Sequence, residues 1–283
     1  MANASSVIVI MLGEYMDSEM LRKVQLVQLE ILKEVKRVCD KHNIHYFLTA
    51  GTLLGAVRHD GFIPWDDDLD IAMLADQYSL FCEIAPKELN PQFYFQNWDN
   101  DPTYPFEYGK VRKKNTLYVE NKSDIKNKPG IYIDIIVYAG APKRKQDRDR
   151  VYKKMLNYRR MLLCTCHYRP WMENDSMNLI KRVGYIYYEI MAKVLGRREI
   201  ISRIKKLRAT SNTDYLFPMI ESKVYTTLMK SWYQESVYHT FEDDIFPIPC
   251  GYEHYLSAVY GDYMKLPPIE QRWNRHQIIE VKT

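Results

Sequence analysis

Several residue types and patterns that define other protein classes are scarce in this chain of 283 residues. Its five cysteines are scattered, and only Cys164 and Cys166 are close together, so the sequence predicts neither a disulfide framework nor a four-ligand zinc site. No stretch approaches the roughly 20 apolar residues of a membrane-spanning helix. The short apolar run Val7–Leu12 lacks the basic region and cleavage site of a signal peptide. We therefore expect a globular protein of the cytoplasm with reduced thiols.

The charge is small on average but unevenly distributed. A formal net charge of +4 is too small to indicate a nucleic-acid partner. Residues 143–208, however, contain 19 Lys or Arg and 6 Asp or Glu, whereas the rest of the chain contains 21 basic and 30 acidic residues. The basic segment is either a solvated helical face or a surface that holds an anionic membrane or an anionic, lipid-linked glycan. Residues 178–195 combine aromatic and basic residues in an amphipathic pattern, as interfacial helices do.

Hydrophobic periodicity predicts both helices and strands. The clearest helix begins at a cap formed by Asp17 or Ser18 and runs to about Lys41, with apolar residues at helical spacing. The other predicted helices are 53–57, 77–88, 145–164 and 177–208, and the predicted strands are 44–50, 68–73, 110–112, 116–120 and 131–137. From about residue 214 the pattern predicts loops and short helices.

Three aspartates stand out in the predicted strands. Asp68 and Asp70 are two residues apart, so on a strand both carboxylates lie on one face. Adjacent carboxylates repel each other, and a shared divalent cation such as Mg²⁺ commonly resolves the repulsion. Asp134 is alone in an apolar strand, where a carboxylate is costly unless it is paired or bound to a metal. If the two strands are neighbours, the three form one metal cluster; Asp66 and Asp67 are interpreted as loop residues or as supports of that cluster.

A second group of candidates precedes the aspartates. Gly51 and Thr52 follow a strand and open a helix, where backbone N–H groups can hold a phosphate. Arg58 and His59 lie between this turn and the aspartates and are candidates for contact with a phosphate or an acceptor. The alternatives are a surface ion pair for Arg58 and a structural hydrogen bond for His59.

These residues belong to a segment that resembles the signature of the LicD family, phosphocholine-transferase-like proteins of the nucleotidyltransferase-fold superfamily that are related to fukutin-type proteins. The resemblance is carried by Gly-Thr-Leu-Leu-Gly, Arg-His, Gly-Phe-Ile-Pro-Trp-Asp-Asp-Asp and Asp-Ile within residues 46–73. Residues 110–116, 130–135, 246–249, 251–256 and 260–268 resemble further family segments. Leu74-Ala75 and the Ile136-Val-Tyr ending of the last predicted strand depart from the family pattern, which leaves the donor or acceptor subtype open.

The resemblance implies an α+β fold, a nucleotidyltransferase-like mixed sheet flanked by helices, with an additional mainly helical region. Together with the change in charge beyond Pro142, it divides the chain into a catalytic core with an N-terminal helix at 1–142, a basic helical region at 143–213 and a C-terminal family segment at 214–283. It places Asp68, Asp70 and Asp134 as catalytic residues and as ligands of one or two Mg²⁺ ions, with Mn²⁺ as an alternative.

The resemblance also implies a reaction. LicD-like enzymes transfer a phospho-alcohol group, phosphocholine above all, from a CDP-linked donor such as CDP-choline to a sugar hydroxyl, and CMP leaves. The acceptor is expected to be a cell-surface glycan such as lipopolysaccharide, a capsule or a teichoic acid precursor. Apart from the resemblance, the scattered cysteines and the basic amphipathic region predict a cytoplasmic location with peripheral contact at the inner face of the plasma membrane, and no nucleic-acid partner is expected.

Five further residues complete the predicted substrate site. Lys110 and Arg112 share a strand face and can grip phosphate, with an exposed basic edge as the alternative. Trp65 and the tyrosines, of which there are 23, are candidates for an aromatic wall around a quaternary ammonium, with core packing as the alternative. Glu242 is a candidate for contact with an alcohol or amine, and His276 for the active site or for C-terminal packing.

Two other functions fit parts of this pattern. A glycosyltransferase that binds a nucleotide sugar through an Asp-x-Asp metal site would use Asp68 and Asp70 but leaves Gly51, Thr52 and Asp134 without a role. A non-catalytic relative that binds a glycan or nucleotide is the alternative of another class, and the intact set of three aspartates argues against it.

Overall fold

The computed structural model describes residues 8–9, 16–120, 130–168, 179–209, 213–220, 227–273, 278 and 280–283. The chain forms two compact units, and each is described by itself. The first unit consists of residues 1–96, 110–136 and 231–283, and the second of residues 97–109 and 137–230. The three-segment division at residues 142 and 213 stays a prediction.

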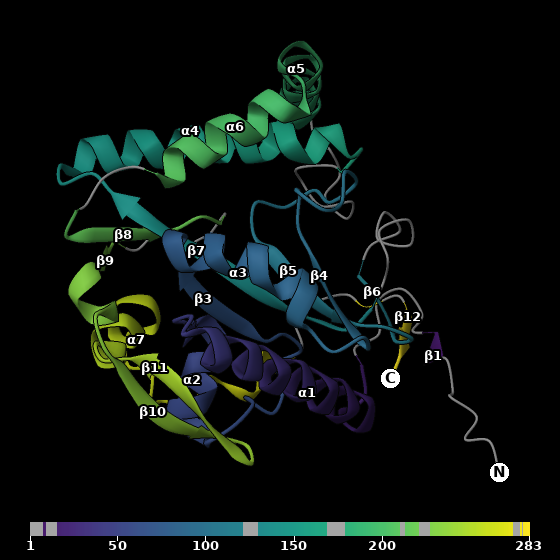
Figure 1. The fold of residues 1–283 in the computed structure, drawn as a ribbon, viewed down its shortest axis with the longest axis vertical. Helices are drawn as coiled ribbons and strands as arrows, with labels where there is room; N and C mark the ends of the chain where they lie inside the picture. Colours follow the sequence, from purple (N-terminus) through teal and green to yellow (C-terminus); the bar gives the residue numbers. More distant parts are fainter. Residues whose placement is uncertain are drawn as a thin grey trace. The chain divides into compact units, whose positions relative to one another are not determined.

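The centre of the first unit is a sheet with the strand order β2-β3-β7-β5-β4. The strands are β2 (Phe47–Leu48), β3 (Asp70–Leu74), β7 (Tyr132–Ala141), β5 (Gly109–Lys113) and β4 (Phe93–Gln96). Strand β7 begins in the first unit and ends in the second. Its side chains are nearly all buried, as expected for a central strand. Together with the helices that flank the sheet (Figure 1), this confirms the predicted α+β fold.

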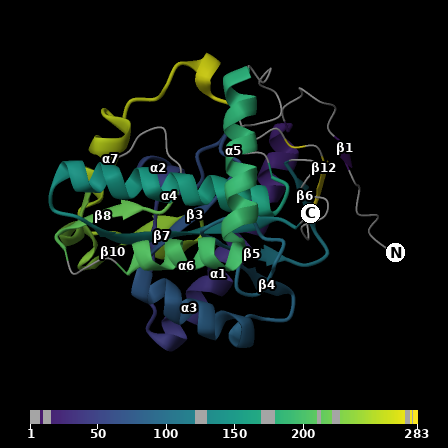
Figure 2. The ribbon, with the colours of Figure 1, turned by 90° about the horizontal axis from the view of Figure 1, so that it is seen from above.

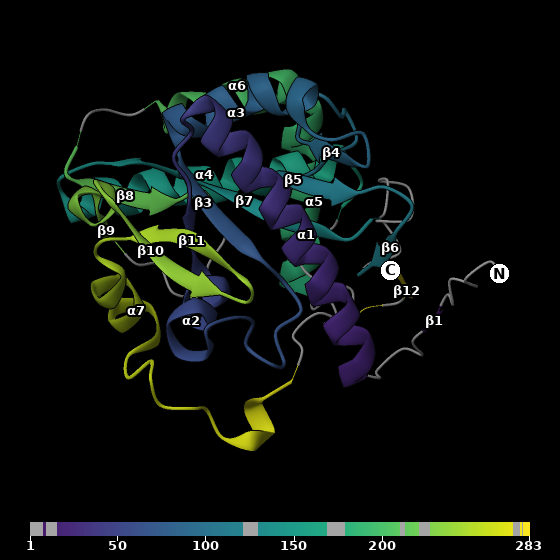
Figure 3. The same cartoon turned by 60° about the horizontal axis from the view of Figure 1, so that its bottom comes forward.

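Helix α1 (Ser18–His42) agrees with its prediction to within one residue at each end. Asp17 caps it by accepting a hydrogen bond of 2.8 Å from the backbone N–H of Met20. Helices α1 and α3 (Ala75–Glu88) lie on the same face of the sheet (Figure 3). The buried side of α1 carries a continuous apolar stripe whose members are Leu21, Val24, Ile31, Leu32, Val35 and Val38.

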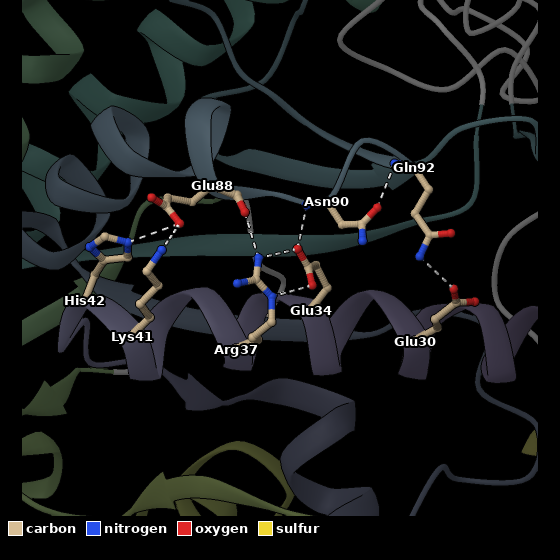
Figure 4. A network of polar contacts seen from close by, with 8 residues as sticks. All are labelled: Glu30, Glu34, Arg37, Lys41, His42, Glu88, Asn90 and Gln92. Atoms are coloured by element: carbon tan, nitrogen blue, oxygen red, sulfur yellow. Dashed lines mark hydrogen bonds and ion pairs between the residues drawn. The ribbon is translucent and has the colours of Figure 1, made fainter.

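Polar contacts fasten α1 to the end of α3 and to the loop that precedes β4 (Figure 4). Arg37 donates 2.7 Å to the carbonyl of Glu88, and the Glu34 carboxylate accepts 2.6 Å from the N–H of Asn90. Lys41 forms an ion pair of 2.6 Å with the Glu88 side chain. The hydrogen bond from Arg37, followed by that from Asn90, holds the pKa of Glu34 below its usual value. These contacts fix the position of α1 against the sheet. Helix α1 in turn contacts the loop that forms part of the site described below.

The sequence pattern missed a hairpin in the C-terminal part of the first unit. Strands β10 (Ser236–Phe241) and β11 (Asp244–Pro249) pair antiparallel, with Tyr238 opposite Pro247. The prolines of β11 hid the strand, since proline cannot donate to a ladder and argues against a strand in a pattern. Here they are accommodated in a two-stranded sheet. The hairpin is preceded by η2 (Lys230–Tyr233) and followed by helix α7 (Tyr252–Tyr260) and the short η3 (Ile269–Gln271).

A small sheet of three short strands completes the described part of the first unit. It joins β12 (Glu280–Lys282) to β6 (Leu117–Val119) on one side and to β1 (Ile8–Val9) on the other, so widely separated parts of the chain meet there.

The second unit is mainly helical, as predicted for the basic region. Helices α4 (Lys145–Thr165), α5 (Leu179–Leu195) and α6 (Arg197–Arg208) pack together, and α5 crosses α4 (Figure 2). Strand β8 (Tyr215–Pro218) pairs with the end of β7 and with β9 (Leu228–Met229). The single helix predicted over 177–208 is wrong in one respect: Gly196, with φ of 74°, divides it into α5 and α6. In the part of the chain that the structure describes, no helix is both long and apolar enough to cross a bilayer.

Candidate active site

A cavity of about 680 Å³ lies in the first unit, between the start of helix α2 (Ala50–His59), the loop before β3 and the segment after α7. Beside several aliphatic residues, its lining contains three kinds of side chain that can bind or react with a substrate. The carboxylates are Asp66, Asp68, Asp70 and Asp262, the aromatic rings are Trp65, Tyr260, Tyr263 and Trp273, and the basic groups are Arg58 and Lys265. Five predicted site residues line this cavity: Gly51, Arg58, Trp65, Asp68 and Asp70.

The third predicted aspartate lies next to the first two. The backbone N–H of Asp134 in β7 donates 2.9 Å to the carbonyl of Leu69, which stands between Asp68 and Asp70. The condition for the predicted cluster, that the two segments be neighbours, is therefore met. Burial raises the pKa of Asp70 well above its usual value, and the charges of Asp68, Asp134 and Asp66 raise it further. Such crowding of carboxylates away from water creates a site that attracts cations.

One detail of the prediction is wrong. Strand β3 begins at Asp70, so Asp68 precedes the strand instead of lying within it. Among the described residues, the trio whose carboxylate oxygens all lie within 4.8 Å of one another is Asp66, Asp67 and Asp68. The loop before β3 therefore brings more carboxylates together than strand alternation alone would do. The metal-ligand roles of Asp68, Asp70 and Asp134 stay predictions.

The Gly51-Thr52 turn contacts the aspartates directly. Helix α2 begins at Ala50, three residues earlier than predicted, so both residues lie in its first turn, whose N–H groups have no acceptor within the helix. The Thr52 hydroxyl accepts 2.8 Å from the N–H of Asp70, which fixes the start of β3 against the helix. Gly51 allows close approach, because a Cβ there would lie 2.4 Å from an Asp66 carboxylate oxygen. Ala50 itself has φ of 49°, a strained value of the kind found at functional sites.

Two buried glutamines that the sequence analysis did not single out hold the acidic loop. The side-chain amide of Gln25 donates 2.9 Å to the Asp66 carbonyl, and that of Gln28 donates 2.9 Å to the Asp67 carbonyl. The Tyr118 hydroxyl also donates to the Asp67 carbonyl, over 3.2 Å. The sequence did contain a signal for these residues, namely two glutamines three positions apart beside the apolar stripe of α1. A glutamine buried at such a position needs hydrogen-bond partners for its amide.

The predicted basic pair is buried and already engaged. Lys110 forms an ion pair of 2.8 Å with Asp134 and lies over the ring of Tyr132. Arg112 donates to the side chain of Gln96 over 2.7 Å and to the carbonyl of Gly130 over 2.8 Å, and its guanidinium also faces Tyr132. The shared face predicted for the two cations is thus present. Neither residue lines the cavity.

Arg58 and Trp65 both line the cavity. Arg58 donates 2.8 Å to the carbonyl of Tyr263, which ties α2 to the segment after α7. Burial lowers the pKa of Arg58 and, more consequentially, that of His59, which the neighbouring arginine lowers further. His59 therefore favours the neutral imidazole, and its ring meets the edge of Trp65. The guanidinium of Arg272 lies 5.4 Å from the Trp65 ring centre.

Glu242 lies at the hairpin turn and does not line the cavity. Its carboxylate forms an ion pair of 2.6 Å with Arg22 of α1 and accepts 3.1 Å from the N–H of Phe62. These partners connect the hairpin to α1 and to the loop that leads to the aspartates. The hydrogen bond from Arg22 is the main reason that the pKa of Glu242 is lowered. His276, the remaining predicted site residue, lies outside the described residues.

We predict that Glu242→Gln lowers the free energy of unfolding by about 1 kcal/mol at pH 7, since the partly exposed ion pair is screened by solvent. The folded-state pKa is lowered, so the contribution is present above the unfolded value of about 4.5 and is lost as the pH falls through the folded value. Urea unfolding of both proteins between pH 7 and pH 3 measures this, and the difference should disappear at the acid end. Asp243→Asn, which removes the exposed partner of Lys33, is the control and should show no comparable change.

The second unit contains a separate cavity of about 780 Å³ between α6 and residues 98–102. Trp98, Arg198 and Lys205 are among its lining residues, and none of the predicted site residues is. The carboxylates and the helix N-terminus that phosphate chemistry needs are in the first unit, so we place the candidate active site there.

Carboxylates at a sheet beside a helix N-terminus suit the binding of phosphates and a cation, and the sequence comparisons identify the class of domain. Residues 43–174 match the LicD/FKTN/FKRP nucleotidyltransferase domain family. The chain is 31% identical over 268 residues to the lipopolysaccharide cholinephosphotransferase LicD of Haemophilus influenzae, an alignment that covers 90% of this chain and 96% of that protein. The chain therefore belongs to the LicD family and to its phosphotransferase enzymes.

Shorter matches fall on uncharacterized proteins. One from Rickettsia typhi is 45% identical over 58 residues, which are 20% of this chain and 19% of that protein. One from Rickettsia prowazekii is 44% identical over 64 residues, 23% of this chain and 22% of that protein.

Proposed function

We propose that the protein transfers phosphocholine from CDP-choline to a sugar hydroxyl of a cell-surface glycan, with release of CMP. The observation that carries the proposal is the composition of the cavity, in which carboxylates, the first turn of α2 and four aromatic rings meet. A relative that aligns along nearly the whole chain is a lipopolysaccharide cholinephosphotransferase, which supports choline and a glycan acceptor. All five cysteines are free in the structure, in agreement with the cytoplasmic location that we propose.

The residues present fit a divalent cation. Asp68 and Asp70 line the cavity, and burial together with the charges of neighbouring aspartates raises the pKa of Asp70, which supports a site for a cation. We propose that Asp68 and Asp70, with Asp134 beside them, hold Mg²⁺. When bound, the ion offsets the negative charge of the donor pyrophosphate and of the departing CMP. Asp66 is a further candidate ligand, since its carboxylate belongs to the close acidic trio.

In this proposal the protein groups orient the donor and move one proton. The first-turn N–H groups of Gly51 and Thr52 hold a phosphate, as helix N-termini do. The acceptor oxygen attacks the phosphorus that carries choline, in line with the bond to CMP, which breaks. The acceptor proton passes to one of the carboxylates that line the cavity. Lys110 neutralises part of the charge of Asp134, and Arg112 and Glu242 act as positioning residues, because their partners are protein groups.

The aromatic side of the cavity suits the choline end of the donor. A quaternary ammonium binds to the faces of aromatic rings, and Trp65, Tyr260, Tyr263 and Trp273 all contribute to the lining. The C-terminal segment supplies three of these four rings. A glycerol or ribitol group has no charge to bind in this way, so the rings favour choline among the alcohols that CDP can carry.

Product analysis with several donors tests the proposal. The protein is incubated with Mg²⁺, a glycan acceptor and CDP-choline, CDP-ribitol, CDP-glycerol or a UDP-sugar, and released nucleotide is measured. Acceptor-dependent CMP release is expected with CDP-choline and not with the UDP-sugar. Release of UDP with transfer of sugar would instead establish the glycosyltransferase alternative, and release from CDP-ribitol or CDP-glycerol alone would refute choline.

We predict that Trp65→Leu raises KM for CDP-choline about tenfold, since one cation–π contact contributes roughly 1–2 kcal/mol in a desolvated site. Trp65→Phe, which retains a ring, is the matched control and should change KM by much less. Steady-state kinetics with CDP-choline and with CDP-glycerol, if the latter turns over, separates the ammonium contact from general damage. An equal loss with both variants would count against an ammonium contact at this residue.

A further inference from the structure

Helix α5 of the second unit presents an apolar stripe to solvent. Five large side chains on it are between 54% and 72% exposed: Val183, Ile186, Tyr187, Ile190 and Val194. Their spacing of three, one, three and four residues places them on one face of the helix. Scattered exposed apolar residues are ordinary, but a contiguous stripe of this length marks a surface that contacts something apolar.

Packing within the unit fixes the direction of this stripe. On the opposite side of α5, Tyr188 and Ala192 are buried, and the helix contacts both α4 and α6. The Tyr188 hydroxyl donates 2.9 Å to the side chain of Asn157 and accepts 3.2 Å from Arg160, both on α4. The helix therefore cannot rotate to bury the stripe without breaking these contacts.

Basic side chains accompany the stripe. Arg182 and Lys193 are exposed on α5 and lie along one flank of the stripe, where Lys193 also pairs with Glu189 over 2.9 Å. They belong to the segment 143–208, in which 19 basic residues stand against 6 acidic ones. A second copy of the chain would bring the same positive helices face to face, which disfavours a dimer through this surface. An anionic surface would be attracted.

We propose that α5 lies flat on an anionic lipid bilayer, with its apolar stripe inserted at the headgroup boundary and its basic side chains on lipid phosphates. The helix has 17 residues and contains Lys181, Arg182, Glu189 and Lys193, so it cannot span the bilayer. From Val183 to Val194 it measures roughly 16 Å, enough for three turns of contact. An apolar face bordered by Lys and Arg is the composition of helices that bind in the interface plane.

This inference rests on α5 alone and not on the proposed transferase reaction. The proposed partner is a membrane surface, in which apolar lipid chains lie beneath negatively charged phosphates. This contact would place the enzyme at the membrane whatever alcohol phosphate it transfers.

Vesicle co-sedimentation of the full chain tests the proposal. We expect the wild type to sediment with vesicles of equal parts phosphatidylcholine and phosphatidylglycerol at low salt, and to bind pure phosphatidylcholine more weakly. Ile190→Ser/Val194→Ser should weaken partitioning about tenfold or more, because two apolar side chains no longer leave water. Leu26→Ser is the matched control, since it removes an exposed apolar residue from a helix of the first unit, and it should bind as the wild type does.

Several outcomes would overturn the proposal. One is that the wild type does not bind to anionic vesicles at low salt. Another is that the double-serine variant binds as strongly as the wild type. A dimer in solution that the double-serine variant dissociates, without vesicle binding, would show that a second copy covers the stripe. Transfer to a soluble acceptor should be the same in the variant and the wild type, and this rate reports on the proposed function separately from membrane binding.

Discussion

Asp70→Asn is expected to lower kcat for phosphocholine transfer by about a thousandfold or more, which corresponds to roughly 4 kcal/mol of transition-state stabilisation. Asp70 begins β3, lines the cavity and is surrounded by the carboxylates of Asp66, Asp68 and Asp134. The amide keeps the shape of the side chain but removes the charge that would hold a divalent cation. Loss of the cation leaves the negative charge of the departing CMP without compensation.

Stability separates this effect from misfolding. Without added metal, Asp70→Asn should be at least as stable as the wild type, because it removes one of several buried, mutually repelling charges. Mg²⁺ should raise the thermal midpoint of the wild type and have little effect on the variant. Asp76→Asn, the same substitution at an exposed position a short distance along the chain, is the control and should keep both activity and the response to Mg²⁺. Full activity of Asp70→Asn would refute the proposed metal site.

Gly51→Ala is expected to reduce kcat by about a hundredfold with little change in stability. The new Cβ would lie 2.4 Å from one carboxylate oxygen of Asp66, too close for the present arrangement. The carboxylate is the end of a flexible side chain and can move away at low cost to the fold. Such a move displaces a charged group of the cavity, and small errors in the position of reacting groups are costly in phosphoryl transfer.

A double-mutant cycle shows whether the effect passes through Asp66. In an Asp66→Ala background, Gly51→Ala should cause little additional loss of kcat, because the carboxylate that it displaces is already absent. Urea unfolding should show a change of less than about 1 kcal/mol in the free energy of unfolding of Gly51→Ala. The higher helix propensity of Ala stabilises the variant by about that amount and offsets the cost of displacing the Asp66 side chain. Independent, additive losses would show that Gly51 acts through the phosphate-binding turn instead.

Local patterns predicted many of the elements because their causes are local. Helix α1 has a capping aspartate and an uninterrupted apolar stripe, and its ends agree to within one residue. The predictions were less accurate where a glycine or a proline determines whether a helix ends or a strand is recognised. Gly196 divides a helix that periodicity would continue, and the prolines of β11 concealed a strand. In both cases the periodic pattern continues through the residue, and the break or the pairing comes from the backbone: a positive φ at Gly196 and a hairpin ladder that accommodates the prolines.

The site was predicted in part. Asp70, Asp68, Gly51, Arg58 and Trp65 do line one cavity, and they come from one segment of 20 residues, so their proximity is partly a matter of chain connectivity. Residues that hold this segment in place come from elsewhere, and sequence reasoning missed the glutamines of α1 that bind loop carbonyls. The tyrosines were predicted only as a group, and the structure places Tyr260 and Tyr263, together with Trp273, in the lining of the cavity.

By itself, the sequence determined the family and the residues of the acidic segment, because a signature of adjacent residues is preserved in the order of the chain. The tertiary structure alone decided which distant groups meet that segment. In the folded chain the N–H of Asp134 donates to the carbonyl of Leu69, and Lys110 forms an ion pair with Asp134. The tertiary structure also left the apolar face of α5 exposed. The physical reason is that hydrogen bonds across a sheet and burial between helices depend on three-dimensional neighbours, which sequence spacing does not specify.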